Sequence, residues 1–209
     1  MIKIDKATDL PKPFLEYALS QGATFENMNK EAKQALRIAL LTEQKFICAY
    51  CNGALKDDPL KTKIEHFKSQ FDKPELQLDY SNLLICCLGN QGKKINDQTC
   101  DTRKANLGLK FSPTDQKIST LIDYENTTGI IKSRDQGFSQ QLDEVLNLNL
   151  KTLQNNRKAA LNSLRDQLRR GGNKTPNFVK IKEQLIQKEK LREYIGIVLV
   201  YLDKKIVKK

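Results

Sequence analysis

The residues best suited to chemistry lie between positions 48 and 100, where all five cysteines occur. Cys48 and Cys51 form a C-x2-C pair, which on a tight turn lets both thiolates bind one Zn²⁺ at about 2.3 Å. Cys86, Cys87 and Cys100 compete for the two positions left in a tetrahedral site. We expect Cys87 and Cys100 to complete a structural zinc site and Cys86 to be a small buried residue. A redox dithiol is the alternative interpretation of the C-x2-C pair.

The only histidine, His66, directly follows Glu65. Neighbours on an extended segment point to opposite sides, so Glu65 can bind a metal while His66 addresses a water molecule. Asp101 follows a candidate zinc ligand, and a bound zinc would hold its carboxylate in place. The structural alternatives are a hydrogen-bonded histidine at position 66 and a helix N-cap at position 101. For Asn82 the alternative is a short helix capped by Ser81 or by Asn82 itself.

Composition favours a polyanionic partner. The 209 residues include 36 Lys and Arg against 25 Asp and Glu, a net charge of +11. Phosphate contacts to such a protein release counterions, which favours nucleic acid. The N-terminus lacks the apolar region of a signal peptide, and no stretch of about 18 apolar residues exists. We therefore expect a cytoplasmic protein with no membrane partner.

Basic residues surround the candidate site, and they are predicted to contact phosphates without reading bases. The predicted nucleic-acid contacts are Lys68, Lys93, Lys94, Arg103 and Lys104. For Lys93 and Lys94, a solvated loop is an equally good interpretation. No ladder of aromatic residues is visible, so sequence preference is expected to be weak.

The elements that position these residues are predicted to be mostly helical. A helix capped by Thr24 or Asn27 is expected to run to about Gln44. Residues 118–124 and 129–133 flank a turn and predict a hairpin. Later helices are expected up to Gly171-Gly172 and from Pro176, and 191–207 fits a buried helix or a strand. These patterns predict an N-terminal helical segment (1–45), a metal-organised core with the hairpin (46–137) and a helical C-terminal region (138–209).

The ordered motifs FICAYCN, IEHF, YSNLLICC and CDTRK resemble the HNH endonuclease family. Together with the later EVLNLN and LQNNRKAAL, they resemble the HNH subunits of Septu-type antiphage defence systems, which also occur in some retron operons. The resemblance covers about residues 45 to 165 and extends more weakly over the rest. It implies an α+β, mostly helical protein with a ββα-metal core, in which two strands and a helix surround one catalytic divalent ion.

The resemblance also implies a role for each matching residue. His66 is the general base, Asn82 orients the loop that bears it, and Glu65 and Asp101 hold Mg²⁺ or Mn²⁺. The four residues that hold the structural zinc are Cys48, Cys51, Cys87 and Cys100. The chain departs from the family pattern in two places. Asp101 stands where the pattern has its final histidine, and the second zinc half-site is not a C-x2-C pair.

These inferences predict a metal-dependent endonuclease that hydrolyses phosphodiester bonds, in DNA first and in tRNA or other RNA second. The resemblance further implies that it is the effector subunit of an antiphage complex with an ATPase, which docks on the helices after Gly137. The alternative is a non-catalytic, zinc-stapled subunit that binds nucleic acid or serves as a scaffold. In that case Glu65 and Asp101 would lie far from His66.

Overall fold

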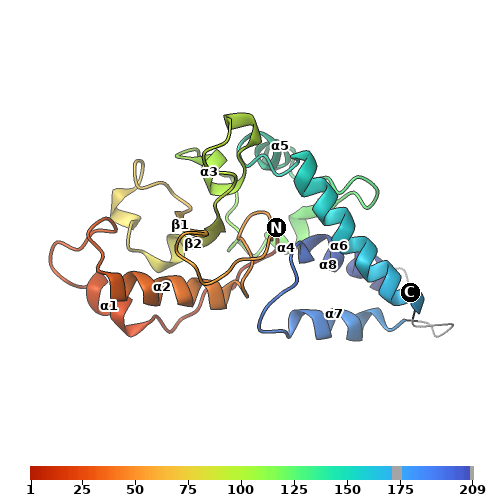
Figure 1. Ribbon diagram of the computed structural model, residues 1–209, viewed down its shortest axis with the longest axis horizontal. Helices are drawn as coiled ribbons and strands as arrows, with labels where there is room; N and C mark the ends of the chain where they lie inside the picture. The colour runs from red at the N-terminus through yellow and green to blue at the C-terminus, as the bar shows by residue number, and fades with distance from the viewer. Residues whose placement is uncertain (171–175, 208–209) are drawn as a thin grey trace.

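The computed structural model describes residues 1–170 and 176–207, and it shows an α+β protein with two small two-stranded antiparallel sheets (Figure 1). Its helices, including three 3₁₀ turns labelled η, are α1 (Lys12–Ala18), α2 (Lys30–Glu43), η1 (Pro74–Leu76), η2 (Tyr80–Asn82), η3 (Ile95–Asp97), α3 (Cys100–Lys104), α4 (Ile118–Leu121), α5 (Gln136–Glu144), α6 (Lys151–Arg170), α7 (Phe178–Ile186) and α8 (Ile195–Ile206). Its strands are β1 (Thr62–His66), β2 (Leu83–Cys87), β3 (Ile122–Tyr124) and β4 (Ile131–Ser133). No helix within these residues is long and apolar enough to cross a membrane.

Helix α2 supports the first sheet from below (Figure 1). Its N-cap is Asn29, whose side chain accepts a hydrogen bond from the Ala32 amide at 2.8 Å, so the predicted caps at Thr24 and Asn27 are wrong. Leu36 and Leu40 are fully buried on its inner face, and each contributes about 2 kcal/mol through burial. Beyond the helix, the Gln44 side chain hydrogen-bonds with both backbone groups of Ile85 at 2.8 Å, which fastens α2 to β2.

The first sheet pairs β1 and β2 antiparallel, with Glu65 opposite Leu84 and His66 opposite Leu83. The long connection between the two strands is folded by η1 and η2. Asp79, rather than Ser81 or Asn82, caps η2 by accepting the Ser81 amide at 2.9 Å. Helix α3 packs against β2, so the short helix and the two strands form one unit.

The other half of the molecule is built on the second sheet and on α5 to α8, which lie to the right in Figure 1. The predicted hairpin is confirmed, but residues 118–121 form α4 instead of extending its first strand. Asp135 caps α5, so the predicted boundary between residues 137 and 138 falls inside a helix.

The C-terminal region is helical where the sequence left two possibilities open. The segment 191–207, for which helix and strand were both expected, contains the helix α8, which packs against α6 and α7. Helix α7 begins at Phe178 with Asn177 as its cap, two residues after the predicted start at Pro176. The predicted stop at Gly171-Gly172 lies outside the described residues.

Candidate functional site: a four-thiol cluster beside a carboxylate pair and one histidine

Four cysteine sulfurs converge from three separate segments of the chain. Cys48 Sγ lies 3.9 Å from Cys100 Sγ, Cys51 Sγ lies 3.9 Å from Cys87 Sγ, and Cys87 Sγ lies 3.8 Å from Cys100 Sγ. All four sulfurs lie within 4.8 Å of one another. The structure therefore brings together the four predicted ligands. Cys86 is fully buried next to them and is not a member of the cluster.

These distances fit a tetrahedral zinc site. Four Zn–S bonds of about 2.3 Å give sulfur–sulfur edges of about 3.8 Å, whereas a disulfide needs about 2.05 Å. All five cysteines are free thiols, and the C-x2-C pair belongs to the larger cluster, which disfavours the redox-dithiol interpretation. Burial disfavours the Cys48 thiolate, but hydrogen bonds from Cys100 and Cys51 outweigh burial and lower the pKa of Cys48 well below its usual value.

Backbone contacts hold the thiols in this arrangement. The Gly53 amide donates to Cys51 Sγ at 3.3 Å, and the Cys48 amide donates to the Gly53 carbonyl at 2.9 Å, which closes the C-x2-C turn. Cys100 has a φ of 56°, an uncommon conformation for a non-glycine residue. Its amide donates to the Leu146 carbonyl at 2.9 Å, which ties α3 to the segment after α5.

Glu65 is buried, at 3% exposed, and its carboxyl group is fully engaged. Tyr50 Oη donates to Glu65 Oε1 at 2.8 Å, and Lys104 Nζ lies 2.9 Å from the same oxygen. Burial, followed by a hydrogen bond with the Asp101 carboxyl group, raises the pKa of Glu65 well above its usual value. Glu65 on β1 and Asp101 on α3 therefore lie close enough to influence each other.

Asp101 is the second residue of α3, and Thr99 stands at the N-cap, so the N-cap interpretation of Asp101 is wrong. Lys63 Nζ lies 2.6 Å from Asp101 Oδ2 and donates to Thr102 Oγ1 at 3.2 Å. Burial alone would raise the pKa of Asp101, but hydrogen bonds from Glu65 and Lys63 outweigh it and lower that pKa. The interaction between the two carboxyl groups therefore shifts their pKa values in opposite directions, up for Glu65 and down for Asp101.

His66 follows Glu65 on β1, so its ring points to the other side of the strand. Its ring is perpendicular to that of Phe25, with centroids 4.5 Å apart, and Nε2 lies 3.0 Å from the Gln77 carbonyl oxygen. A carbonyl only accepts, so the proton resides on Nε2 and Nδ1 keeps its lone pair. Burial lowers the pKa of His66, although the Gln77 carbonyl and the Asp101 charge oppose it, so the ring is neutral near pH 7.

Asn82 clamps the segment that follows His66. Its Oδ1 accepts the Lys68 amide at 2.8 Å, and its Nδ2 donates to the carbonyls of Lys68 at 3.0 Å and Leu76 at 3.2 Å. The side chain is only 5% exposed. It joins the end of η2 to the segment after β1, which is the arrangement that the predicted orienting role requires.

The basic residues predicted to bind nucleic acid lie in different settings. Lys104 is 0% exposed and pairs with Glu65, so the prediction that it contacts phosphates is wrong, because a sealed ammonium cannot reach them. Arg103 is half-buried and donates to the carbonyls of Ile95 at 2.9 Å and Glu144 at 3.3 Å, which gives it a structural role. Lys68, Lys93 and Lys94 are exposed.

Sequence reasoning missed Tyr50 as part of this site. It lies between the two cysteines of the C-x2-C pair and is fully buried. Nothing in the local sequence indicates that Tyr50 does more than connect the two cysteines. Only the packing of the knuckle under β1 brings its hydroxyl to Glu65.

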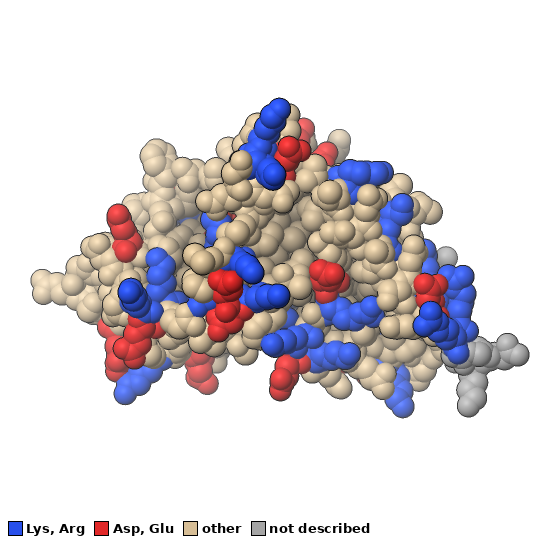
Figure 2. Space-filling model, in the orientation of Figure 1, with Lys and Arg blue, Asp and Glu red and all other residues tan. Residues whose placement is uncertain are grey.

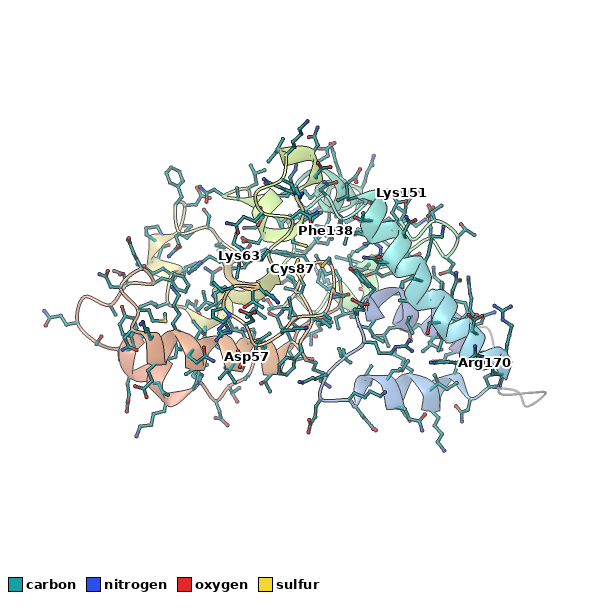
Figure 3. All side chains as sticks on the ribbon, in the orientation of Figure 1. Asp57, Lys63, Cys87, Phe138, Lys151 and Arg170 are labelled. Carbon is teal, nitrogen blue, oxygen red and sulfur yellow. The ribbon has the colours of Figure 1, made fainter. Side chains whose placement is uncertain are left out.

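Figure 3 labels Lys63 and Cys87, which lie close together at the first sheet. The pairing of Thr62 with Cys87 in the sheet agrees with this view. The thiol cluster and the carboxylate pair thus occupy one region, since Cys100 and Asp101 are consecutive residues of α3.

No protein-family model matches the chain, and a search of the curated proteins finds no match.

Proposed function

We propose that this protein is a metal-dependent HNH endonuclease whose ββα-metal core consists of β1, β2 and α3. One observation carries the proposal: Lys104 Nζ lies 2.9 Å from Glu65 Oε1 and donates to the His66 carbonyl at 3.3 Å, while Lys63 Nζ lies 2.6 Å from Asp101 Oδ2, so β1 and α3 gather the two carboxyl groups and the histidine in one region. The interaction of Asp101 with Glu65 supports the separation of at most about 5 Å that two oxygen ligands of one divalent ion require.

The carboxylate pair and the thiol cluster suit two different metals. Carboxylate oxygens favour Mg²⁺ or Mn²⁺, and four thiolates favour zinc. In this proposal Glu65 and Asp101 hold the catalytic ion, while Cys48, Cys51, Cys87 and Cys100 hold a structural zinc that fixes the start of α3. The catalytic ion would supply positive charge to neutralise the transition state of phosphodiester hydrolysis.

His66 acts as the general base. Its Nδ1 lone pair accepts a proton from the attacking water, and the hydrogen bond from Nε2 to the Gln77 carbonyl fixes the ring orientation. Asn82 is a positioning residue that holds the segment after His66 through three hydrogen bonds. Lys63 and Lys104 balance the charge of the carboxylates when no metal is bound.

The biological setting of the proposal comes from the resemblance to Septu-type HNH subunits. We place the protein in an antiphage complex with an ATPase that docks on the C-terminal helices, with DNA as the first substrate and tRNA as the second. The charge of +11 supports a nucleic-acid substrate of either kind.

A non-catalytic, zinc-stapled nucleic-acid-binding subunit is the second candidate, and one observation favours it. The three groups are more buried than an open catalytic cleft requires, with Glu65 at 3%, the Asp101 side chain at 12% and His66 at 8% exposed. Substrate would have to approach along Lys63, whose side chain is 34% exposed.

A cleavage assay separates the two candidates. Zinc-loaded chain, alone and co-purified with its partner ATPase, is mixed with labelled duplex DNA and tRNA in Mg²⁺ or Mn²⁺. We expect cleavage that His66→Ala reduces by about 10²- to 10⁴-fold. Gln70→Ala, at an exposed position on the same loop, is the matched control. Undiminished cleavage by a folded His66→Ala variant would exclude the general-base role, and no cleavage by any preparation would favour the non-catalytic candidate.

A further inference from the structure

A positively charged groove lies between α2 and β1, outside the residues discussed so far as ligands. It has a volume of about 530 Å³, within the range of ligand-binding cavities. Its lining residues are Phe25, Lys30, Lys33, Gln34, Arg37, Pro59, Thr62, Lys63 and Ile64. Four of these are cationic, and no Asp or Glu occurs among them. The visible face in Figure 2 carries positive and negative residues side by side, so a lining with cations and no acid is a local feature of the groove.

The cations of α2 form a stripe on one helix face. Lys30, Lys33 and Arg37 are spaced by three and four residues, which places them above one another along the helix. Lys30 and Lys33 are exposed, and neither forms an ion pair within the described residues. Their ammonium groups are thus available to an external anion.

Arg37 provides a second, independent observation. The residue is only 6% exposed, yet it belongs to the lining of the groove. Arg37 Nη1 forms an ion pair with Asp57 Oδ1 at 2.7 Å that lacks hydrogen-bond geometry, and Arg37 Nη2 donates to Gln34 Oε1. The N–H bonds of Nη1 thus have no aligned acceptor, and a phosphate oxygen in the groove would provide one.

The groove leads to the candidate catalytic groups at two points. Phe25 lines it and packs edge-on against His66, with centroids 4.5 Å apart. Lys63 also lines it, and its ammonium group lies 2.6 Å from Asp101. An extended polyanion in the groove would therefore pass from α2 toward the residues proposed to cleave it.

We propose that this groove binds the sugar-phosphate backbone of a nucleic-acid strand, with Lys30, Lys33 and Arg37 contacting consecutive phosphates. Because the bound strand is the substrate, the inference rests on the proposed function. In this proposal residues of α2, rather than Lys104 and Arg103, contact the phosphates. The sequence patterns do not single out these α2 residues.

Binding is measured without turnover, so that this inference and the nuclease activity fail separately. Full-length His66→Ala protein is titrated into fluorescein-labelled 20-nucleotide DNA and, separately, RNA of the same sequence, at several salt concentrations. The test variant also carries Lys30→Ala and Lys33→Ala. The matched control carries Lys151→Ala and Lys180→Ala instead, two exposed lysines on α6 and α7, and Figure 3 labels Lys151 far from Lys63.

We expect the Lys30→Ala/Lys33→Ala protein to bind at least tenfold more weakly than the control at low salt. The slope of log K against log salt should fall by about 1.4, or about 0.7 for each lost contact. If DNA and RNA binding weaken equally, the groove contacts the phosphate backbone that both share. If only RNA binding weakens, the groove also contacts the 2′-hydroxyl groups. Affinity and slope equal to those of the control would overturn the inference, whether or not the parent chain cleaves.

Discussion

The thiol cluster and the carboxylate pair meet at α3, where Cys100 belongs to the first and Asp101 to the second. They differ in the charged groups that surround them. The four sulfurs have the spacing of a tetrahedral zinc site, with three of the sulfur–sulfur distances at 3.8 to 3.9 Å and all within 4.8 Å. No lysine or arginine forms a hydrogen bond to them within the described residues. The carboxyl groups of Glu65 and Asp101, in contrast, are paired with Lys104 at 2.9 Å and Lys63 at 2.6 Å.

This difference indicates that the two sites bind metal in different ways. Zinc completes the cluster and becomes part of the folding free energy. A divalent ion at the carboxylate pair must compete with the ammonium groups of Lys104 and Lys63. We therefore expect tight, constitutive zinc and a weaker second ion that binds reversibly.

Removing a zinc ligand should have the largest effect. Cys48→Ser leaves three thiolates, so we expect loss of the bound zinc and unfolding of the region around β1, β2 and α3, because structural zinc contributes roughly 10 kcal/mol or more in small zinc-binding peptides. Metal content per chain and thermal unfolding measure this. Cys86→Ala is the matched control, and it should keep one zinc per chain. A zinc-free chain that melts like the parent would refute the structural role.

Breaking the buried ion pair should have the next largest effect. Lys104→Met leaves Glu65 without its cation, and we expect a loss of about 3 kcal/mol in the free energy of unfolding. Added Mn²⁺ should raise the melting temperature of this variant more than that of the parent, because the ion takes over the charge of the missing ammonium. Lys61→Met is the control, because the Lys61 side chain is 65% exposed. It should change neither the free energy of unfolding nor the rise in melting temperature with Mn²⁺. Equal responses to Mn²⁺ would show that Lys104 does not occupy a metal-competent site.

Loss of the positioning residue should be smaller. Asn82→Ala removes three hydrogen bonds from a buried site, and we expect about 2 kcal/mol of destabilisation. If Asn82 orients His66, the cleavage rate should fall by more than the loss of folded protein accounts for. The pH profile of the remaining activity should also shift. Ser81→Ala, at the exposed neighbouring position, is the control. A variant with full activity and an unchanged pH profile would confine Asn82 to a structural role.

The smallest effect is the pH dependence that His66 contributes to stability. Burial places its pKa in the folded chain below the 6.5 of an exposed histidine, so the unfolded chain binds more protons between the two values. This contribution is present above pH 6.5 and is lost as the pH falls through the lowered pKa. Urea midpoints from pH 5 to 8 should therefore decrease less toward acid for His66→Gln than for the parent. Parallel curves would contradict the burial-driven shift.

The thiol cluster was more predictable from the sequence than the carboxylate site, for physical reasons. Spacing and residue type nearly define a four-cysteine zinc site, and neighbours on a strand face opposite ways, so only one of Cys86 and Cys87 can join it. The burial of Lys104 depends on how α3 packs against the sheet, which no local pattern encodes. Similarly, the β-branched residues of α8 fit a strand equally well, and packing against α6 and α7 decides the outcome.

Titration of the zinc-loaded chain with Mn²⁺, followed by calorimetry, tests the central claim most directly. We expect one Mn²⁺ per chain, binding lost in Asp101→Asn and in Glu65→Gln, and binding retained in His66→Ala, where the base is removed but both carboxylates remain. Absence of stoichiometric binding to the parent, or identical binding by the parent and Asp101→Asn, would contradict a catalytic metal held by Glu65 and Asp101.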